Sequence, residues 1–134
     1  MTAQIKHYQD KLNYEIDSAD LTDFFKGENF NEKLVVIDTR TADAFEEEHI
    51  PGAKSFPHRN MDEKSVMSLD KEALYITYCD GIGCNASTKG AIKMAKFGFK
   101  VKELMGGLDW WKRDGYSTEG KAGVKRNVDV HCAC

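Results

Sequence analysis

Short runs of consecutive apolar residues alternate along the chain with stretches whose apolar residues are spaced three or four positions apart. The runs Leu34–Asp38 and Leu74–Tyr78 are rich in β-branched and aromatic residues, which is typical of strands buried on both faces of a parallel sheet. Helical spacing marks residues 19–26, 42–48 and 87–97. Because strands and helices alternate, the pattern predicts an α/β fold with a parallel sheet covered by helices on both faces.

Turn and capping residues set the expected bounds of the other elements. Ser18 and Thr41 are expected to cap the first two helices, and Pro51-Gly52 breaks the chain before a short strand at residues 53–56. Residues 57–70 are expected to be irregular, and a further strand covers residues 101–104. Gly106-Gly107 then leads into a last helix, with Trp110 expected in the core and Trp111 at the edge of a pocket.

The chain divides by this reading into one domain with short flanking segments. We expect an N-terminal extension over residues 1–14, the domain over residues 15–120, and a tail over residues 121–134 that ends in His131-Cys132-Ala133-Cys134. A length of 134 residues with 41% hydrophobic content suits a single core. The tail is open to three interpretations: a soft-metal site, a mobile dithiol that accepts sulfur, or a disordered end.

Charge and apolar content exclude two classes of partner. The net charge is -3, and no basic block is present that would follow a phosphate backbone, so we expect no nucleic-acid partner. No apolar run approaches the roughly 20 residues of a membrane span, so we expect no membrane partner and a cytoplasmic location. In that compartment the four cysteines are expected to be free thiols in the resting state.

The carboxyl ends of three predicted strands carry polar or flexible residues. Asp38 and Arg40 follow one strand, Cys79 follows the next, and Met105-Gly106-Gly107 follow the last. Ligands of open parallel sheets bind at this edge, so we expect the three segments to lie together. Asp38 and Arg40 are expected to support the loop rather than react, with Asp38 accepting backbone N–H bonds and Arg40 pairing with a carboxylate such as Glu46.

The segment after Leu74–Tyr78 has the layout of a reactive thiol site. Cys79 ends the strand, a glycine-rich loop follows, and the next helix begins near Ser87. Backbone N–H groups of the loop and the helix N-terminus are expected to stabilise a thiolate, with the hydroxyls of Ser87 and Thr88 as further donors. The predicted active-site loop comprises Asp80, Gly81, Ile82, Gly83, Asn85, Ala86 and Ser87, and Asp80 is expected to point to solvent.

Two groups of residues in this chain resemble the signatures of the rhodanese domain. The first is Asp38-Thr39-Arg40 with Phe45–Ala53, and the second is Tyr78-Cys79 with its loop, followed by Gly98-Phe99, Val101, Leu104 and Gly106–Trp110. The resemblance covers about Ile16 to Tyr116. It implies a single rhodanese-like domain with a five-stranded parallel sheet, in which Cys79 carries sulfur as a persulfide. It also implies a small-molecule or protein sulfur donor and acceptor, without a cofactor or a bound metal.

The loop departs from that family's pattern in two ways. Common single-domain members have a shorter loop that ends with an arginine, whereas no Arg or Lys lies within Asp80–Ser87 here, which puts thiosulfate as the natural donor in doubt. Lys89 is either a replacement cation or a solvated helix residue. The second departure is Cys84, an accessory thiol close enough to pair with Cys79; it either resolves an intermediate on Cys79, attacks first, or only fills space.

Other readings of the loop fit the residues less well. A phosphatase of the same fold needs an arginine six residues after its cysteine, where this chain has Asn85. The glycine spacing also matches a dinucleotide fingerprint with Glu103 as the ribose acid, but two cysteines crowd that turn. The sequence therefore favours a sulfurtransferase, with a non-enzymatic binding or thiol redox module using Cys79 and Cys84 as the alternative.

Overall fold

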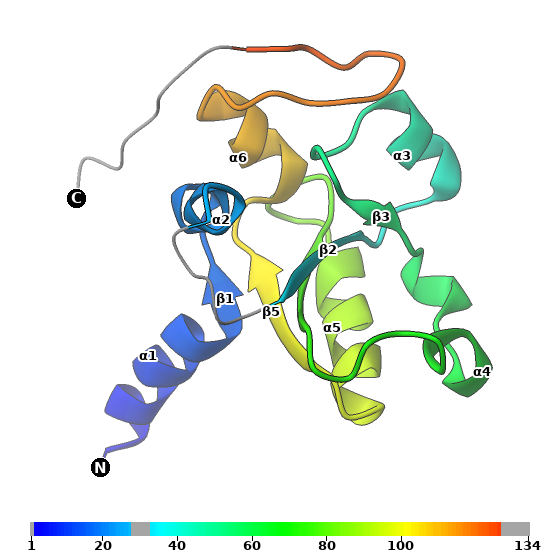
Figure 1. Ribbon diagram of the computed structural model, residues 1–134. Coiled ribbons are helices and arrows are strands. Elements are labelled where there is room, and N and C mark those ends of the chain that lie inside the picture. Colours follow the sequence, from blue (N-terminus) through cyan, green and yellow to red (C-terminus); the bar gives the residue numbers. More distant parts are fainter. Residues whose placement is uncertain (1, 28–32, 127–134) are drawn as a thin grey trace.

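A single sheet of five parallel strands forms the centre of the molecule (Figure 1). The computed structural model describes residues 2–27 and 33–126. The strands are β1 (Glu15–Ile16), β2 (Leu34–Asp38), β3 (Lys54–Ser55), β4 (Leu74–Tyr78) and β5 (Lys100–Leu104). They lie in the order β1-β5-β4-β2-β3, so the cysteine-bearing strand β4 is central. The predicted α/β fold with a five-stranded parallel sheet is confirmed.

Helices cover both faces of this sheet. They are α1 (Ala3–Tyr14), α2 (Ser18–Phe25), α3 (Ala42–Glu47), α4 (Glu63–Val66), α5 (Ala86–Lys96) and α6 (Gly107–Arg113), with a 3-10 turn η1 at His58–Asn60. Helices α2 and α6 pack on one face, and α5 lies on the other with α4 beyond it (Figure 1). Thr41 caps α3 as predicted, whereas Asp17 rather than Ser18 caps α2.

Strand β4 contributes to two separate apolar cores. Leu74, Ile76 and Tyr78 point into the core formed with α2 and α6, while Tyr75 points into the core formed with α5. All five β4 residues are buried, because both faces of the strand are covered. This burial explains why the strand reads as a continuous apolar run, and it fixes the position of the cysteine that follows.

Two segments hold more structure than the sequence indicated. The N-terminal extension forms α1, which has no buried residue, and it runs directly into β1 on the edge of the sheet beside β5. Residues 57–70, expected to be irregular, contain η1 and the single turn of α4. Neither short helix has a periodic apolar face long enough to be recognised in the sequence.

The first residues of the predicted tail are tied to the domain by backbone hydrogen bonds. Lys121 and Ala122 donate N–H groups to the carbonyls of Glu46 and Glu47. The structure therefore extends past residue 120, while the tail residues Cys132 and Cys134 lie outside the described residues. In the part of the chain that is described, no helix is long and apolar enough to cross a membrane.

Candidate active site

The carboxyl ends of β2, β4 and β5 meet at one edge of the sheet, as the sequence predicted. Thr39 donates its backbone N–H and its hydroxyl to the carbonyl of Tyr78, at 3.1 and 2.7 Å. From the other side, the first turn of α6 donates to the cysteine loop: Leu108 N–H to Cys79 O at 2.9 Å and Asp109 N–H to Asp80 O at 2.7 Å. The start of the loop is thus held by backbone contacts to both neighbouring segments.

Gly107 permits this close approach of α6 to the loop. Its φ is +57°, and a Cβ at this position would collide with the carbonyl oxygen of Cys79. A side chain at residue 107 would therefore push α6 away from the loop or displace Cys79. This contact gives a physical reason for the glycine pair that the sequence places after β5.

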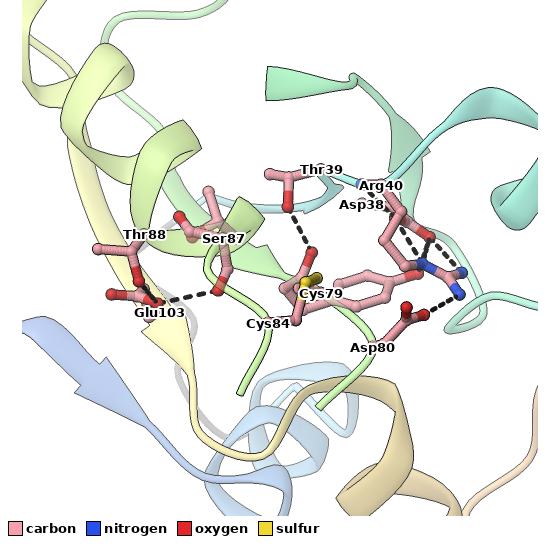
Figure 2. The surroundings of a disulfide bond; sticks show 11 residues. Asp38, Thr39, Arg40, Cys79, Asp80, Cys84, Ser87, Thr88 and Glu103 are labelled. Carbon is pink, nitrogen blue, oxygen red and sulfur yellow. Dashed lines mark hydrogen bonds and ion pairs between the residues drawn. A yellow bond between two sulfur atoms is a disulfide. The ribbon is translucent and has the colours of Figure 1, made fainter. Parts of the chain in front are cut away.

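Cys79 and Cys84 form a disulfide across the loop (Figure 2). Their Cα atoms are 6.2 Å apart, within the range that a disulfide spans without backbone movement. This finding corrects the expectation of free thiols for this pair. Cys79 is buried, with 2% of its surface exposed, whereas Cys84 is half-buried.

The loop residues between and after the two cysteines have different environments. Ile82 is 79% exposed, and Gly83 adopts a φ of +97° that favours glycine. Cys84 N–H donates to Gly81 O, so this N–H closes a turn instead of facing the Cys79 sulfur as expected. Asn85 precedes the first turn of α5 without a side-chain capping bond, Ala86 begins the helix, and Ser87 is buried.

On the β2 side of the loop, a buried ionic network joins four side chains. We call Asp38, Arg40, Tyr78 and Asp80 the Asp38 cluster; Figure 2 labels Asp38, Arg40 and Asp80. Arg40 pairs with the fully buried Asp38 at 2.7 Å and with the exposed Asp80 at 2.9 Å, while the Tyr78 hydroxyl donates to Asp38 at 2.8 Å. Arg40 pairs with carboxylates as expected, but its partners are Asp38 and Asp80 rather than Glu46, because the guanidinium turns toward β2 and the loop.

The hydrogen bonds of the Asp38 cluster are consistent with the predicted supporting role. Asp38 accepts the backbone N–H of Arg40 at 3.0 Å, and Arg40 also donates to the carbonyl of Glu48. Asp80 is exposed, as predicted, but it is paired with Arg40 rather than free. Through that pair the cluster holds the residue directly after Cys79.

Burial fixes the protonation states in the Asp38 cluster. Burial, together with the adjacent Asp38 carboxylate, raises the pKa of the Tyr78 hydroxyl, which therefore stays a donor. Burial alone would lower the pKa of Arg40, but hydrogen bonds and charge from Asp38, with a smaller contribution from Asp80, outweigh it and raise this pKa. The Tyr78 hydroxyl and the Arg40 guanidinium thus both keep their protons in the physiological range.

On the β5 side, a carboxylate receives the two hydroxyls that were expected to serve the thiolate. Ser87 and Thr88 both donate to the same Glu103 oxygen, each at 2.9 Å, and we call these three residues the Glu103 cluster (Figure 2). The predicted role of these hydroxyls as donors to sulfur is not seen. Glu103 also lies opposite Glu15 in the register of β5 and β1, and Glu15 is itself paired with Lys11 at 2.9 Å, so Glu103 is the carboxylate with hydroxyl partners on this side of the loop.

Two hollows described here are lined by the cysteines of the loop. A small cavity of about 140 Å³ is lined by both cysteines, by Glu15 and by Glu103. A wider groove of about 740 Å³ lies on the other side, and Cys84 lines it whereas Cys79 does not. Cys84 therefore faces both spaces, and Cys79 faces the small cavity alone.

The cations that line the wider groove are all neutralised by carboxylates. Arg40 pairs within the Asp38 cluster, Lys112 pairs with Glu48 at 2.7 Å, and Arg113 pairs with Asp109 at 3.1 Å. Lys89, the residue considered as a replacement cation, is exposed on α5. The pKa of His58 is lowered mainly by burial, and the positive charges of Lys93 and Lys89 lower it further.

The two tryptophans exchange the positions that the sequence suggested. Trp111 is buried, with 3% of its surface exposed, and donates its indole N–H to Ser117 O at 2.8 Å. Trp110 is 41% exposed and lines the groove beside Ile82. The expectation of Trp110 in the core is therefore wrong, because α6 directs Trp111 toward the sheet instead.

The sulfur atoms of Cys79 and Cys84 and a carboxylate oxygen of Asp80 lie within 4.8 Å of one another. Such a group resembles part of a soft-metal site, but each sulfur is bonded to the other and neither is available as a thiolate ligand. The tail His131, Cys132 and Cys134, the other metal candidates, lie outside the described residues.

Sequence reasoning did not assign Glu103, Glu15 and the Tyr78 hydroxyl to this site. Glu103 was considered as a ribose ligand, yet its position near the carboxyl end of β5 was the signal that it faces the loop. Glu15 has no comparable signal, because β1 has two residues and its register with β5 is set by packing.

Comparisons with known proteins agree with this architecture. The rhodanese-like domain family matches residues 22–114. Thiosulfate sulfurtransferase GlpE of Coxiella burnetii is 37% identical over 81 residues, which cover 59% of this chain and 72% of GlpE. The crystal structure of BH2092 from Bacillus halodurans aligns with a TM-score of 0.82 at 43% identity, covering 96% of this chain and 92% of that one. A Lactobacillus plantarum protein aligns with a TM-score of 0.72 at 25% identity, covering 87% and 96%. On the match to most of its length, the chain belongs to the rhodanese-like domain family.

Proposed function

We propose that the protein is a sulfurtransferase that carries sulfane sulfur as a persulfide on Cys79. The observation that carries this proposal is the position of Cys79. It is buried at the end of the central strand, anchored by α6, and open to a cavity of about 140 Å³. That volume suits a small sulfur species better than the roughly 300–1,000 Å³ sites that hold larger ligands. The similarity to GlpE supports the same chemistry.

The reaction begins from the reduced loop. The Cys79 thiolate attacks the sulfane sulfur of a donor, the rest of the donor leaves with the electron pair of the broken bond, and Cys79 gains one sulfur atom. A nucleophilic acceptor then attacks the outer sulfur, and the Cys79 thiolate is the leaving group. Loop N–H groups and the N-terminus of α5 are the expected stabilisers of both sulfur anions.

The charges around the loop favour a donor with a low negative charge. Glu15 and Glu103 line the small cavity; Glu15 is paired with Lys11, whereas Glu103 accepts two hydroxyls, and the cations of the wider groove are paired with carboxylates. A dianion such as thiosulfate would meet carboxylates without a free guanidinium to offset them. We therefore propose a persulfide or polysulfide monoanion as the donor, with a thiol as the acceptor.

Mass spectrometry of the loop peptide tests the persulfide. Trypsin leaves both cysteines on the peptide of residues 72–89, so Cys84→Ser makes the assignment unique. After reduction and removal of the reductant, the Cys84→Ser chain is incubated with glutathione persulfide or thiosulfate. One added sulfur on this peptide is expected, and it should be absent from a control chain that carries both Cys79→Ser and Cys84→Ser. A peptide that gains no sulfur from either donor would overturn the proposal.

The disulfide supports a second candidate function, a thiol redox module that uses Cys79 and Cys84 without sulfur transfer. The same experiment separates the two. A redox module would close its disulfide with disulfide oxidants, such as oxidised glutathione, and the Cys84→Ser chain would gain no sulfur from the donors.

A further inference from the structure

We infer that Cys84 is a second catalytic thiol, which attacks the Cys79 persulfide and releases its outer sulfur as hydrosulfide. This inference rests on the proposed function, since it needs the persulfide as its substrate. It assigns the protein a further activity, the reductive release of sulfide, in addition to transfer to an outside acceptor.

The disulfide identifies which sulfur Cys84 can reach. In the closed loop, Cys84 Sγ is bonded to Cys79 Sγ, the atom that would be the inner sulfur of a persulfide. The Cα separation of 6.2 Å lets the two side chains meet without backbone movement. An attack along this path therefore breaks the bond between the inner and outer sulfur atoms.

The step balances without an outside oxidant. The Cys84 thiolate forms a bond to Cys79 Sγ of the protonated persulfide, and the outer sulfur leaves as hydrosulfide, keeping that proton and the electron pair of the broken bond. Cys84 is oxidised to the disulfide level while the sulfane sulfur is reduced to sulfide. Hydrosulfide is the anion of a stronger acid than an ordinary thiol, so it leaves more readily than a thiolate does.

A dithiol reductant completes the cycle. One of its thiolates attacks the protein disulfide, its second thiol displaces the mixed disulfide, and both cysteines return as thiols while the reductant becomes a disulfide. Cys84 lines the wider groove and is half-buried, so it is the sulfur that such a reductant can approach. Cys79, at 2% exposure, is shielded from it.

Access to the persulfide favours the internal nucleophile. Cys79 faces the cavity of about 140 Å³ and does not line the wider groove, so a bulky acceptor has little room to reach the sulfur bound to it. Cys84 borders the same cavity and needs no entry path.

The disulfide closes a loop of only five residues, so it constrains the unfolded chain little. It therefore contributes less to stability than a disulfide that closes a long loop.

A single-turnover experiment without reductant tests the inference. Full-length chains carrying Cys132→Ser and Cys134→Ser, which remove the tail thiols, are reduced, freed of reductant and treated with glutathione persulfide or thiosulfate. Sulfide is measured above the amount released by Cys79→Ser, and the mass of peptide 72–89 is recorded. The chain with both loop cysteines is expected to release close to one sulfide and to end as the disulfide.

The matched variant is Cys84→Ser in the same background. It is expected to keep the added sulfur on Cys79 and to release at least about tenfold less sulfide. Circular dichroism of each variant checks that the fold is retained.

The other outcomes each reject a defined statement. If both chains keep the added sulfur and neither releases sulfide, Cys84 does not resolve the persulfide, and the proposed transfer function stands alone. If the extra sulfur moves to Cys84 without sulfide release, the attack is on the outer sulfur and the inference is equally overturned. If neither chain takes up sulfur, the persulfide itself is refuted.

Discussion

The two sides of the cysteine loop hold it by different physical means. On the β2 side, the Asp38 cluster is buried and joins a guanidinium to two carboxylates and a phenol. On the β5 side, the Glu103 cluster is half-exposed and satisfies a carboxylate with two hydroxyls. In the first arrangement each carboxylate faces the same guanidinium, whereas in the second the partners of the carboxylate are uncharged hydroxyls.

This difference indicates a division of labour. Breaking a buried ion pair leaves an uncompensated charge in the interior, so the β2 side is expected to govern stability. A carboxylate near a thiol disfavours the thiolate at little structural cost, so the β5 side is expected to govern reactivity. Substitutions on the two sides should therefore change different measured quantities.

Removal of the Asp38 charge is expected to have the largest effect. Asp38→Asn leaves Arg40 buried with a single exposed partner, and we expect the free energy of unfolding in urea to fall by about 3–5 kcal/mol. Asp43→Asn, on the exposed first turn of α3, is the control and should change it by less than about 1 kcal/mol. Equal losses for the two variants would contradict a structural role for the buried cluster.

Loss of the Tyr78 hydroxyl should have the next largest effect. This hydroxyl donates to Asp38 and accepts the buried N–H of Ile50 at 3.1 Å, so Tyr78→Phe leaves both without a partner. We expect a loss of about 1–3 kcal/mol in urea unfolding. Tyr75→Phe, which removes a half-buried hydroxyl bonded to Asp70 O, should lose about half as much. If Tyr78→Phe were as stable as Tyr75→Phe, the hydrogen bonds of the β2 side would not have the stabilising role given to them.

Glu48 lies at the outer edge of the β2 side and should give a pH-dependent effect. Burial would raise its pKa, but hydrogen bonds from Lys112 and Thr118 outweigh burial and lower it below the usual 4.5. A carboxyl with a lowered folded pKa stabilises the protein above its unfolded pKa, and this contribution disappears as the pH falls through the folded value.

The corresponding test compares Glu48→Gln with the wild type in urea at several pH values. The variant should be less stable by about 1 kcal/mol at pH 7, and the difference should close toward pH 3. Glu46→Gln, at an exposed position of the preceding helix α3, serves as the control. If the difference in free energy of unfolding between Glu48→Gln and the wild type stays constant with pH, the Glu48 charge is not the source of the lost stability.

The smallest effect on stability is expected on the β5 side, where Glu103→Gln keeps an acceptor for Ser87 and Thr88 but removes the charge. The free energy of unfolding should change by less than about 0.5 kcal/mol. Alkylation of reduced Cys79 at neutral pH, in a chain carrying Cys84→Ser, should become about two- to threefold faster. An unchanged or slower rate of alkylation would show that the Glu103 charge does not lower the reactivity of Cys79.

The sequence predicted correctly those elements whose structure follows from the pattern of their own residues. The apolar runs of β2 and β4 predicted buried parallel strands, and the rule for carboxyl ends then brought Asp38, Arg40 and Cys79 together. Failures arose where partners distant in sequence decide the outcome. Arg40 had several carboxylates within reach, and the selection of Asp38 and Asp80 over Glu46 depends on tertiary packing.

Other failures had equally specific causes. Adjacent helical residues differ by about 100° in direction, so the apolar pattern alone could not decide which of Trp110 and Trp111 faces the core. Helix α1 has no buried residue, because its apolar residues Ile5, Tyr8 and Leu12 recur at helical spacing but remain exposed instead of packing on the sheet. The loop disulfide depends on geometry and redox conditions, neither of which is written in residue spacing.

The exposed Trp110 provides the molecule with a built-in optical reporter. Its indole borders the same groove as Cys84, while the Trp111 indole is buried and bonded to Ser117. Disulfides quench nearby indole emission by electron transfer, so the brightness of Trp110 should follow the opening and closing of the loop, with Trp111 as a steadier background. Single turnovers of the two cysteines can thus be followed in a stopped-flow fluorimeter without a label.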